Sequence, residues 1–99
     1  MSEFQVIYED ESFLCHLQEI EGKAIFHVEV RGKLTLSDIR RGRKAFYKIK
    51  EEVVSKGYER LFAATPSPHF ASLVGPGFLH LQTVHGLELI VWELKQPSL

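Results

Sequence analysis

The spacing of apolar residues changes once along the chain, and this change limits what the chain can fold into. Up to residue 30, apolar residues occupy alternate positions, which is the period of a β-strand. After residue 36 they recur every three or four positions, which is the period of one helix face. The members of this second series are Ile39, Gly42, Phe46, Ile49 and Val53. A chain with both periods is expected to combine strands and a helix in one fold.

Three apolar runs come first, separated by turn residues. They cover residues 4–8, 12–19 and 24–30, and Gly22 stands in the second turn. Short alternating runs between turns are typical of neighbouring antiparallel strands. The first 30 residues are therefore predicted to form an antiparallel meander.

The helix is expected at about residues 36–56. Thr35 or Ser37 can cap its start, because a hydroxyl there accepts a hydrogen bond from a free backbone N–H. Asp38 falls in the first turn, where negative charge is favoured. Gly57 suits the left-handed residue that follows a helix.

Four further elements follow the helix. They are an apolar strand, a turn with a short helix, and the two strands of a hairpin, at residues 60–65, 66–75, 78–84 and 87–94. Both faces of the last strand are apolar, so it is either central in the sheet or covered by a partner. The order β-β-β-α-β-α-β-β predicts an α+β domain at residues 1–95, with one mixed, mostly antiparallel sheet and a tail at 96–99.

Composition fits one cytoplasmic domain. The chain has 99 residues, 44% of them hydrophobic, and a net charge of −1. The single cysteine excludes an internal disulfide and suits a reducing compartment. No apolar run approaches the roughly 18 residues that span a bilayer, and the acidic start does not have the pattern of a signal peptide. We therefore expect a cytoplasmic protein without a membrane partner.

Charge is distributed unevenly. Residues 31–50 contain 8 of the 12 basic residues against one acid, whereas residues 1–29 contain seven acids against Lys23 alone. Two copies could attract one another through these segments, or the basic segment could meet an anionic ligand or an acidic partner. Nucleic acid is not expected, because the net charge is not basic and the basic run lacks interleaved aromatic residues.

A metal site is not expected either. The five histidines have no HxxxH or HExxH spacing, and one cysteine cannot supply a zinc pattern. Cys15 alternates with Phe13 and Leu17, so we interpret it as a core thiol rather than a nucleophile.

The segments "FHVEV", "SKGYERLFAAT" and "HFASLVGPGF", in this order around the helix, carry a resemblance to a known family. The chain resembles the core of the GNAT superfamily, the acetyl-CoA-dependent N-acetyltransferases. The resemblance covers about residues 2–94 and implies a GNAT-like core that lacks the first strand and the two helices with which that fold normally begins. Short GNAT-like proteins encoded by phages are also similar, which implies a viral origin and a location in the host cytoplasm.

The resemblance implies a cofactor site at the start of the helix. The family motif Arg/Gln-x-x-Gly-x-Gly/Ala falls on Ser37, Arg40 and Gly42, of which only Gly42 agrees with it. Arg40, Arg41 and Arg43 could instead pair with phosphates through their side chains. The candidate cofactor-binding residues are Ser37, Arg40, Arg41, Gly42 and Arg43. Binding of acetyl-CoA or coenzyme A is expected to be weakened or lost.

The resemblance also implies where chemistry would occur. The family's general base is commonly a glutamate or a water relay near its fourth strand. The matching position is Glu29, and His27 lies on the same strand face. The tyrosine that often serves as general acid is missing from residues 70–73, "FASL". Glu29 and His27 are therefore the catalytic candidates, and whether the chain is an enzyme stays open.

We favour the hypothesis that the chain binds another protein, such as a host enzyme if the gene is viral. Its partner-binding candidates are Arg40, Arg43, Lys44 and Trp92. One alternative is an active acetyl-CoA-dependent N-acetyltransferase. A second is a structural homodimer or larger homo-oligomer, for example a virion component, in which the acidic meander of one copy meets the basic helix of another.

Overall fold

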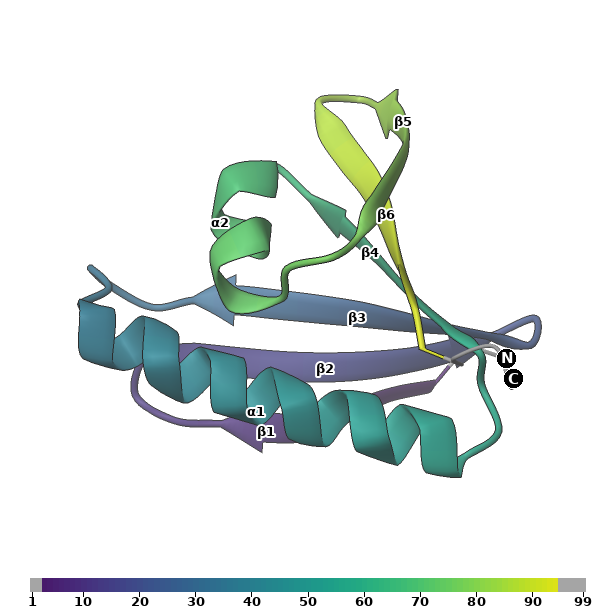
Figure 1. The fold of residues 1–99 in the computed structure, drawn as a ribbon, viewed down its shortest axis with the longest axis horizontal. Coiled ribbons are helices and arrows are strands. Elements are labelled where there is room, and N and C mark those ends of the chain that lie inside the picture. Colours follow the sequence, from purple (N-terminus) through teal and green to yellow (C-terminus); the bar gives the residue numbers. More distant parts are fainter. Residues whose placement is uncertain (1–2, 95–99) are drawn as a thin grey trace.

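The computed structural model describes residues 3–94, and these form an α+β fold with one six-stranded sheet (Figure 1). The elements in chain order are β1 (Glu3–Glu9), β2 (Phe13–Ile20), β3 (Lys23–Val30), α1 (Leu36–Ser55), β4 (Arg60–Thr65), α2 (Pro68–Val74), β5 (Leu79–Val84) and β6 (Leu87–Glu93). The strands lie in the order β1-β2-β3-β4-β6-β5. Only β3 and β4 pair in parallel within this sheet. The predicted fold class, a mixed and mostly antiparallel sheet with helices, is confirmed; the predicted tail at 96–99 lies outside the described residues.

The meander β1-β2-β3 is antiparallel throughout. A two-residue turn joins β2 to β3, and both of its residues, Glu21 and Gly22, have positive φ. Turns of this kind match the twist of a hairpin, and they fix which residues face each other. As a result, Phe13, Cys15 and Leu17 all point to one side of the sheet and are buried.

Helix α1 begins as the sequence predicts. Thr35 is its N-cap, and Thr35 and Asp38 form a reciprocal capping box. The helix ends at Ser55, and Gly57 follows with a φ of 96°. Its buried residues are Gly42, Ala45, Phe46, Ile49 and Val53. The helical period therefore places one apolar side of α1 on the sheet.

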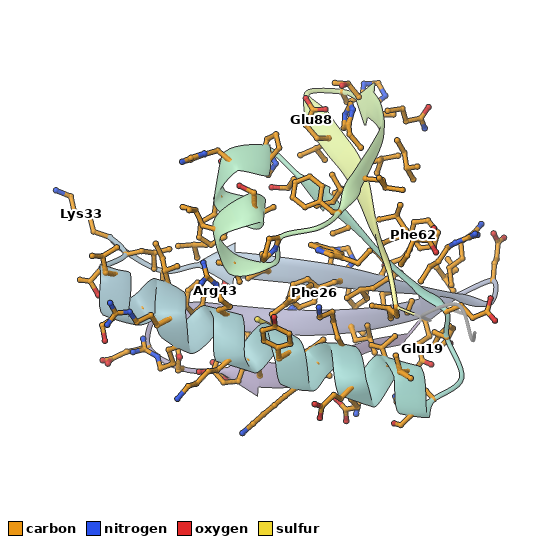
Figure 2. All side chains as sticks on the ribbon, in the orientation of Figure 1. Glu19, Phe26, Lys33, Arg43, Phe62 and Glu88 are labelled. Atoms are coloured by element: carbon orange, nitrogen blue, oxygen red, sulfur yellow. The ribbon has the colours of Figure 1, made fainter. Side chains whose placement is uncertain are left out.

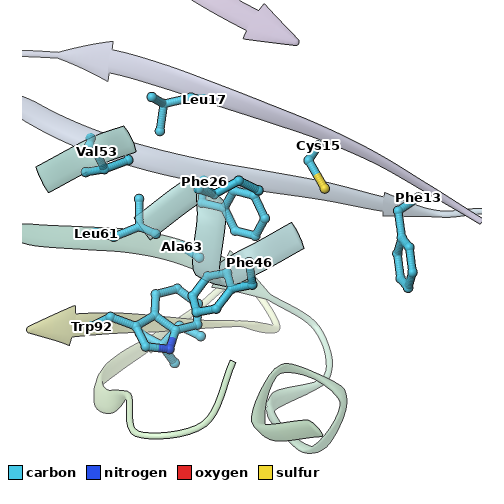
Figure 3. Packing of buried hydrophobic residues seen from close by; sticks show 12 residues of the cluster. Phe13, Cys15, Leu17, Phe26, Phe46, Val53, Leu61, Ala63 and Trp92 are labelled. Atoms are coloured by element: carbon cyan, nitrogen blue, oxygen red, sulfur yellow. The ribbon is translucent and has the colours of Figure 1, made fainter. Parts of the chain in front are cut away.

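The core lies between the sheet and the two helices (Figure 3). Phe46 of α1 packs between Phe26 and Trp92, at ring-centroid distances of 5.7 and 4.8 Å. Phe70 of α2 packs against Phe13, with ring centroids 6.4 Å apart. These aromatic residues of β2, β3 and β6 point to the same side of the sheet, so both helices cover that side. No helix within residues 3–94 covers the other side.

The sheet divides at the parallel pair. Strands β3 and β4 are joined by three residue pairs, from Ala24↔Leu61 to Phe26↔Ala63. Beyond these pairs, β4 turns away from β3 together with β5 and β6 (Figure 1). The sheet therefore has two parts, the meander β1-β2-β3 and the segment β4-β6-β5. The three pairs between β3 and β4 join them.

Candidate functional site

The start of α1, where a phosphate site is expected, is occupied by the chain's own side chains. The Thr35 hydroxyl accepts a hydrogen bond from the Asp38 N–H at 3.1 Å, and Asp38 Oδ2 accepts one from the Thr35 N–H at 2.8 Å. The Asp38 carboxylate thus supplies the negative charge that a helix start attracts. An anionic ligand would have to approach this carboxylate.

Arg41 connects the helix start to the turn between β1 and β2. Its Nε donates to Asp10 Oδ2 at 2.8 Å, and its Nη2 donates to Asp38 Oδ1 at 2.6 Å and to the Ser12 hydroxyl at 3.0 Å. Asp10 Oδ1 also accepts from the backbone N–H groups of Ser12 and Phe13, at 2.7 and 2.8 Å. The Tyr8 hydroxyl donates to the other oxygen, Oδ2. We call Tyr8, Asp10, Ser12, Asp38 and Arg41 the Arg41 network.

Hydrogen bonding keeps both carboxylates of the Arg41 network ionised. Burial by itself would raise the pKa of Asp10, but the hydrogen bonds from Tyr8, Arg41 and the backbone hold that pKa far below its usual value. Hydrogen bonds from the Thr35 backbone, and then from Ser12 and Arg41, lower the pKa of Asp38 to about 2. At neutral pH the Arg41 guanidinium therefore faces two ionised carboxylates. Its positive charge is paired with Asp10 and Asp38 and is not available to a ligand.

The structure does not bring the five cofactor-binding candidates together at one site. Arg41 belongs to the network just described, and Arg43 donates to the Leu73 carbonyl through Nη2 at 2.8 Å (Figure 2). Gly42 is buried, and a Cβ there would lie 3.1 Å from the ring of Phe13. Ser37 and Arg40 are exposed. Gly42 thus packs against Phe13, and two of the three arginines are held by protein groups.

The two catalytic candidates lie on the sheet side without helices. His27 Nε2 is 3.0 Å from the side-chain oxygen of Gln18, and burial, with a smaller effect of His16, lowers the pKa of His27. Glu29 is exposed, 3.9 Å from Arg31 Nε. Arg31 also pairs with Glu9 at 3.2 Å. His27 and Glu29 therefore point the same way from β3, but each interacts with a different polar neighbour.

An apolar cavity of about 50 Å³ lies where β3 and β4 separate. Its lining comes from β1, β2, β3, β4, β6, both helices and Gly75, and includes Phe26, Phe46, Ala63 and Trp92 (Figure 3). Cys15 is also in the lining, and burial raises the pKa of its thiol to about 12. The cavity has room for a small apolar group, and its thiol is protonated at neutral pH, as expected for a core residue.

The sheet side without helices, which we call the open face, carries many of the exposed apolar side chains. Strand pairing arranges its central residues in two rows that cross the strands. Row one contains Phe4, Gln18, Ile25, Phe62, Val91 and Leu79. Row two contains Val6, His16 and His27 in the meander and Ala64, Leu89 and Gln82 beyond it. Phe4 is 60% exposed, Val6 53% and Leu79 57%.

Sequence reasoning missed the open face as a surface. The available signal is that apolar residues occur at both alternating positions in the meander, for example Leu14 beside Phe13 and Cys15 in β2. Such residues are buried on one face and half-buried or exposed on the other. The pattern shows two apolar faces, and only the fold shows which one the helices cover.

Of the four partner-binding candidates, three lie at the surface and one lies in the core. Arg40 and Lys44 are exposed on the outer side of α1, whereas Arg43 is tied to Leu73. Trp92 is 5% exposed, and its indole N–H donates to the Gly75 carbonyl at 2.7 Å. The expectation that Trp92 meets a partner is therefore wrong, because β6 lies between β4 and β5 and this ring fills the core.

Comparisons with known proteins give no relative to argue from. Neither protein-family models, nor curated proteins, nor solved structures match the chain. Within residues 3–94, no group of three or more histidine, cysteine, aspartate and glutamate side chains could hold a metal ion. No helix in that range is long and apolar enough to cross a bilayer.

Proposed function

We propose that the chain is a protein-binding module and that the open face is its docking surface. The observation that carries this proposal is the set of exposed apolar side chains on that face, led by Phe4, Val6 and Leu79. Water-soluble proteins rarely expose contiguous apolar patches larger than a few hundred Å², and larger ones mark interaction sites. Burying this patch against another protein would release the water that it now orders.

The sheet edges favour docking on the face over docking on an edge. Each of the two edge strands is irregular: the pairing of β1 shifts between Val6 and Tyr8, and that of β5 shifts between His80 and Gln82. A bulge twists an edge strand and hinders the addition of another strand. A partner is therefore expected to meet the face of the sheet rather than extend it.

The Arg41 network supports binding rather than cofactor chemistry. Asp38 already occupies the helix start, and Arg41 is held by Asp10 and Asp38. Arg40 is the exposed arginine left near this helix start. This arrangement supports the proposal that binding of acetyl-CoA is weakened or lost.

The finer fold assignment is part of the same proposal. We infer a GNAT-like core without its first strand and first two helices, from the order β-β-β-α-β-α-β-β and the resemblance of the segments around α1. The proposed location is the cytoplasm, or the host cytoplasm if the gene is viral, in keeping with a single buried thiol.

Two matched valine substitutions test the docking surface. Val6 on the open face and Val54 on the outer side of α1 are 53% and 46% exposed. Immobilised wild-type, Val6→Glu and Val54→Glu chains are compared for the proteins that each captures from a bacterial lysate, quantified by mass spectrometry. We expect wild type and Val54→Glu to capture the same proteins, and Val6→Glu to capture them at least about tenfold less. Equal capture by all three chains would reject the open face as the docking surface.

An N-acetyltransferase is the second candidate, because of one specific observation. The apolar cavity between β3 and β4 lies beside α1 and could take the methyl end of an acetyl group. Calorimetry with acetyl-CoA separates the candidates. We expect no heat at millimolar acetyl-CoA; binding that Arg40→Glu weakens would favour the acetyltransferase instead.

A further inference from the structure

We propose that His16 and His27 together bind a divalent transition-metal ion, of the class of Zn²⁺, Ni²⁺ and Cu²⁺, on the open face. This inference goes beyond the proposed function, because the ion would bind whether or not a protein docks there. It is carried by the pairing of the two histidines across neighbouring strands and by the hydrogen bond that orients one of them.

Strand pairing brings the two histidines together. They are eleven residues apart in the chain, so the sequence shows no metal-binding spacing. In the sheet they are direct partners, with His16 of β2 opposite His27 of β3. Directly opposed residues of an antiparallel pair have Cβ atoms about 4.5–5.5 Å apart. From this separation, one nitrogen of each ring can reach a shared ion at the roughly 2.0–2.1 Å of a zinc–histidine bond.

Both imidazole rings lie on the open face beside one aromatic neighbour. The residues that alternate with them, such as Cys15 and Phe26, are buried on the helix side. The ring of Phe4 contacts both imidazoles, with its centroid 6.2 Å from that of His16 and 5.1 Å from that of His27. Because one ring touches both, the two side chains lie close together, and not only their backbones.

His27 is in the form that binds a metal ion. Burial, and to a smaller extent the neighbouring His16, lowers the pKa of His27, so its ring is neutral at neutral pH. Its Nε2 lies 3.0 Å from the side-chain oxygen of Gln18. An amide oxygen only accepts, so Nε2 carries the proton and Nδ1 keeps its lone pair. Metal-ligating histidines usually donate their second nitrogen in this way, which fixes the orientation of the ring.

His16 supplies the second ligand. The ring is half-buried, and no group within residues 3–94 hydrogen-bonds to it. Its nitrogens are therefore free to bind an ion in place of water. Imidazole nitrogen suits Zn²⁺, Ni²⁺ and Cu²⁺, whereas Mg²⁺ and Ca²⁺ prefer oxygen ligands. With two protein ligands, the ion keeps positions open for water or for a side chain of a docked protein.

A second pair of ligand-type side chains, His80 and Glu88, lies on the hairpin of β5 and β6. These two side chains bind each other, and the Thr83 hydroxyl donates to the same Glu88 oxygen at 2.7 Å. A metal ion would have to break this contact before it could bind there. His80 is therefore the matched comparison for the two histidines of the meander.

Calorimetric titration of Zn²⁺ into the untagged chain tests the site. We expect one Zn²⁺ per chain in wild type and in His80→Gln, with binding at least about tenfold weaker in His16→Gln and in His27→Gln. Mg²⁺ should give no heat. Circular dichroism verifies that each variant is folded. Zn²⁺ should also raise the melting temperature of wild type more than that of either meander variant, because a ligand stabilises the folded chain that holds it.

A measurement on the unaltered chain makes the test independent of how the variants fold. Cu²⁺ is paramagnetic, and a substoichiometric amount should broaden the ring-proton NMR signals of His16 and His27 before those of His69 and His80. Signals that broaden together, or first at His80, would place the ion elsewhere and contradict the proposal.

Three calorimetric results would also overturn the inference. They are no binding at millimolar Zn²⁺, equal binding in wild type and both meander variants, and loss of binding in His80→Gln. Failure here is distinguishable from failure of the docking surface, because capture by Val6→Glu is a separate readout. A chain that captures proteins through the open face but binds no Zn²⁺ would reject this inference and keep the proposed function.

Discussion

Gly75 shows how a single small residue fixes the position of a loop. Its φ is −134°, which any residue can adopt, so backbone freedom does not explain the glycine. A Cβ at this position would lie 2.5 Å from Cε2 of Phe46. Phe46 cannot easily withdraw, because it packs between Phe26 and Trp92. The close approach also lets the Gly75 carbonyl accept the indole N–H of Trp92.

Gly75→Ala is therefore expected to lower the free energy of unfolding by about 2 kcal/mol, as overpacked cores do. Gly42→Ala is the matched comparison. Its Cβ would lie 3.1 Å from two atoms of the Phe13 ring, but alanine in a helix gains about 1 kcal/mol over glycine. Urea denaturation measures both. A loss for Gly42→Ala as large as that for Gly75→Ala would contradict this account of the two glycines.

Asp10 is expected to make stability depend on acid pH. Its pKa in the folded chain lies below the value of 3.8 for a free carboxyl, mainly because hydrogen bonds outweigh the effect of burial. The unfolded chain then takes up the proton first, so this stabilisation is present above about pH 4 and is lost as the pH falls toward the folded pKa. Asp10→Asn should melt about 5 °C lower at pH 7 and lose less on going to pH 3.

Thermal melts at several pH values measure this difference. The exposed neighbour Glu11→Gln is the control and is expected to follow wild type. If wild type and Asp10→Asn lost equal stability between pH 7 and pH 3, the role assigned to Asp10 would be wrong.

Among the elements, α1 was predictable almost to the residue, whereas its connections were not. The period of three and four, Thr35 as a cap and Gly57 as a stop are local signals, and the helix spans Leu36–Ser55 against the expected 36–56. The pair Arg41–Asp10 joins residues 31 positions apart, so no local pattern reports it. Because of this pair, Arg41 is a structural arginine and is not available to a ligand.

Thr35→Ala is expected to lower the free energy of unfolding by about 1 kcal/mol, because the Asp38 N–H loses its hydrogen-bond acceptor. Ser37→Ala lies two residues further along, inside the helix, and should change stability by less than about 0.5 kcal/mol. Chemical denaturation of both variants tests whether Thr35, rather than Ser37, caps the helix. Equal effects would contradict the capping geometry.

Strand β6 shows the limit of pattern reading for a single element. Two apolar faces predict either a central strand or a strand covered by a partner, and the structure places β6 between β4 and β5. Trp92 is a partner-binding candidate in the sequence because both faces of its strand are apolar. Periodicity reports that a face is apolar, but it does not report what covers it.

For the whole molecule, the change of period together with the order β-β-β-α-β-α-β-β was enough to predict an α+β fold with one mixed sheet. The open face could not be predicted in the same way. A crossover between parallel strands is right-handed and sets the side of α1, but α2 could have covered either side. Its Phe70 contacts Phe13, so both helices share one side, and the other side carries no helix of residues 3–94. The candidate docking surface is thus a property of topology rather than of any motif.

The short parallel junction between β3 and β4 has a consequence for how the native state fluctuates. Because three residue pairs join the two parts of the sheet, separating them breaks fewer backbone hydrogen bonds than opening the eight-pair hairpin β2–β3. Native-state amide hydrogen exchange should therefore detect partial opening at Leu61–Ala63 at a lower free energy than at Leu14–Gln18. The two parts would then behave as separate cooperative units, with the apolar cavity exposed to solvent each time the junction opens.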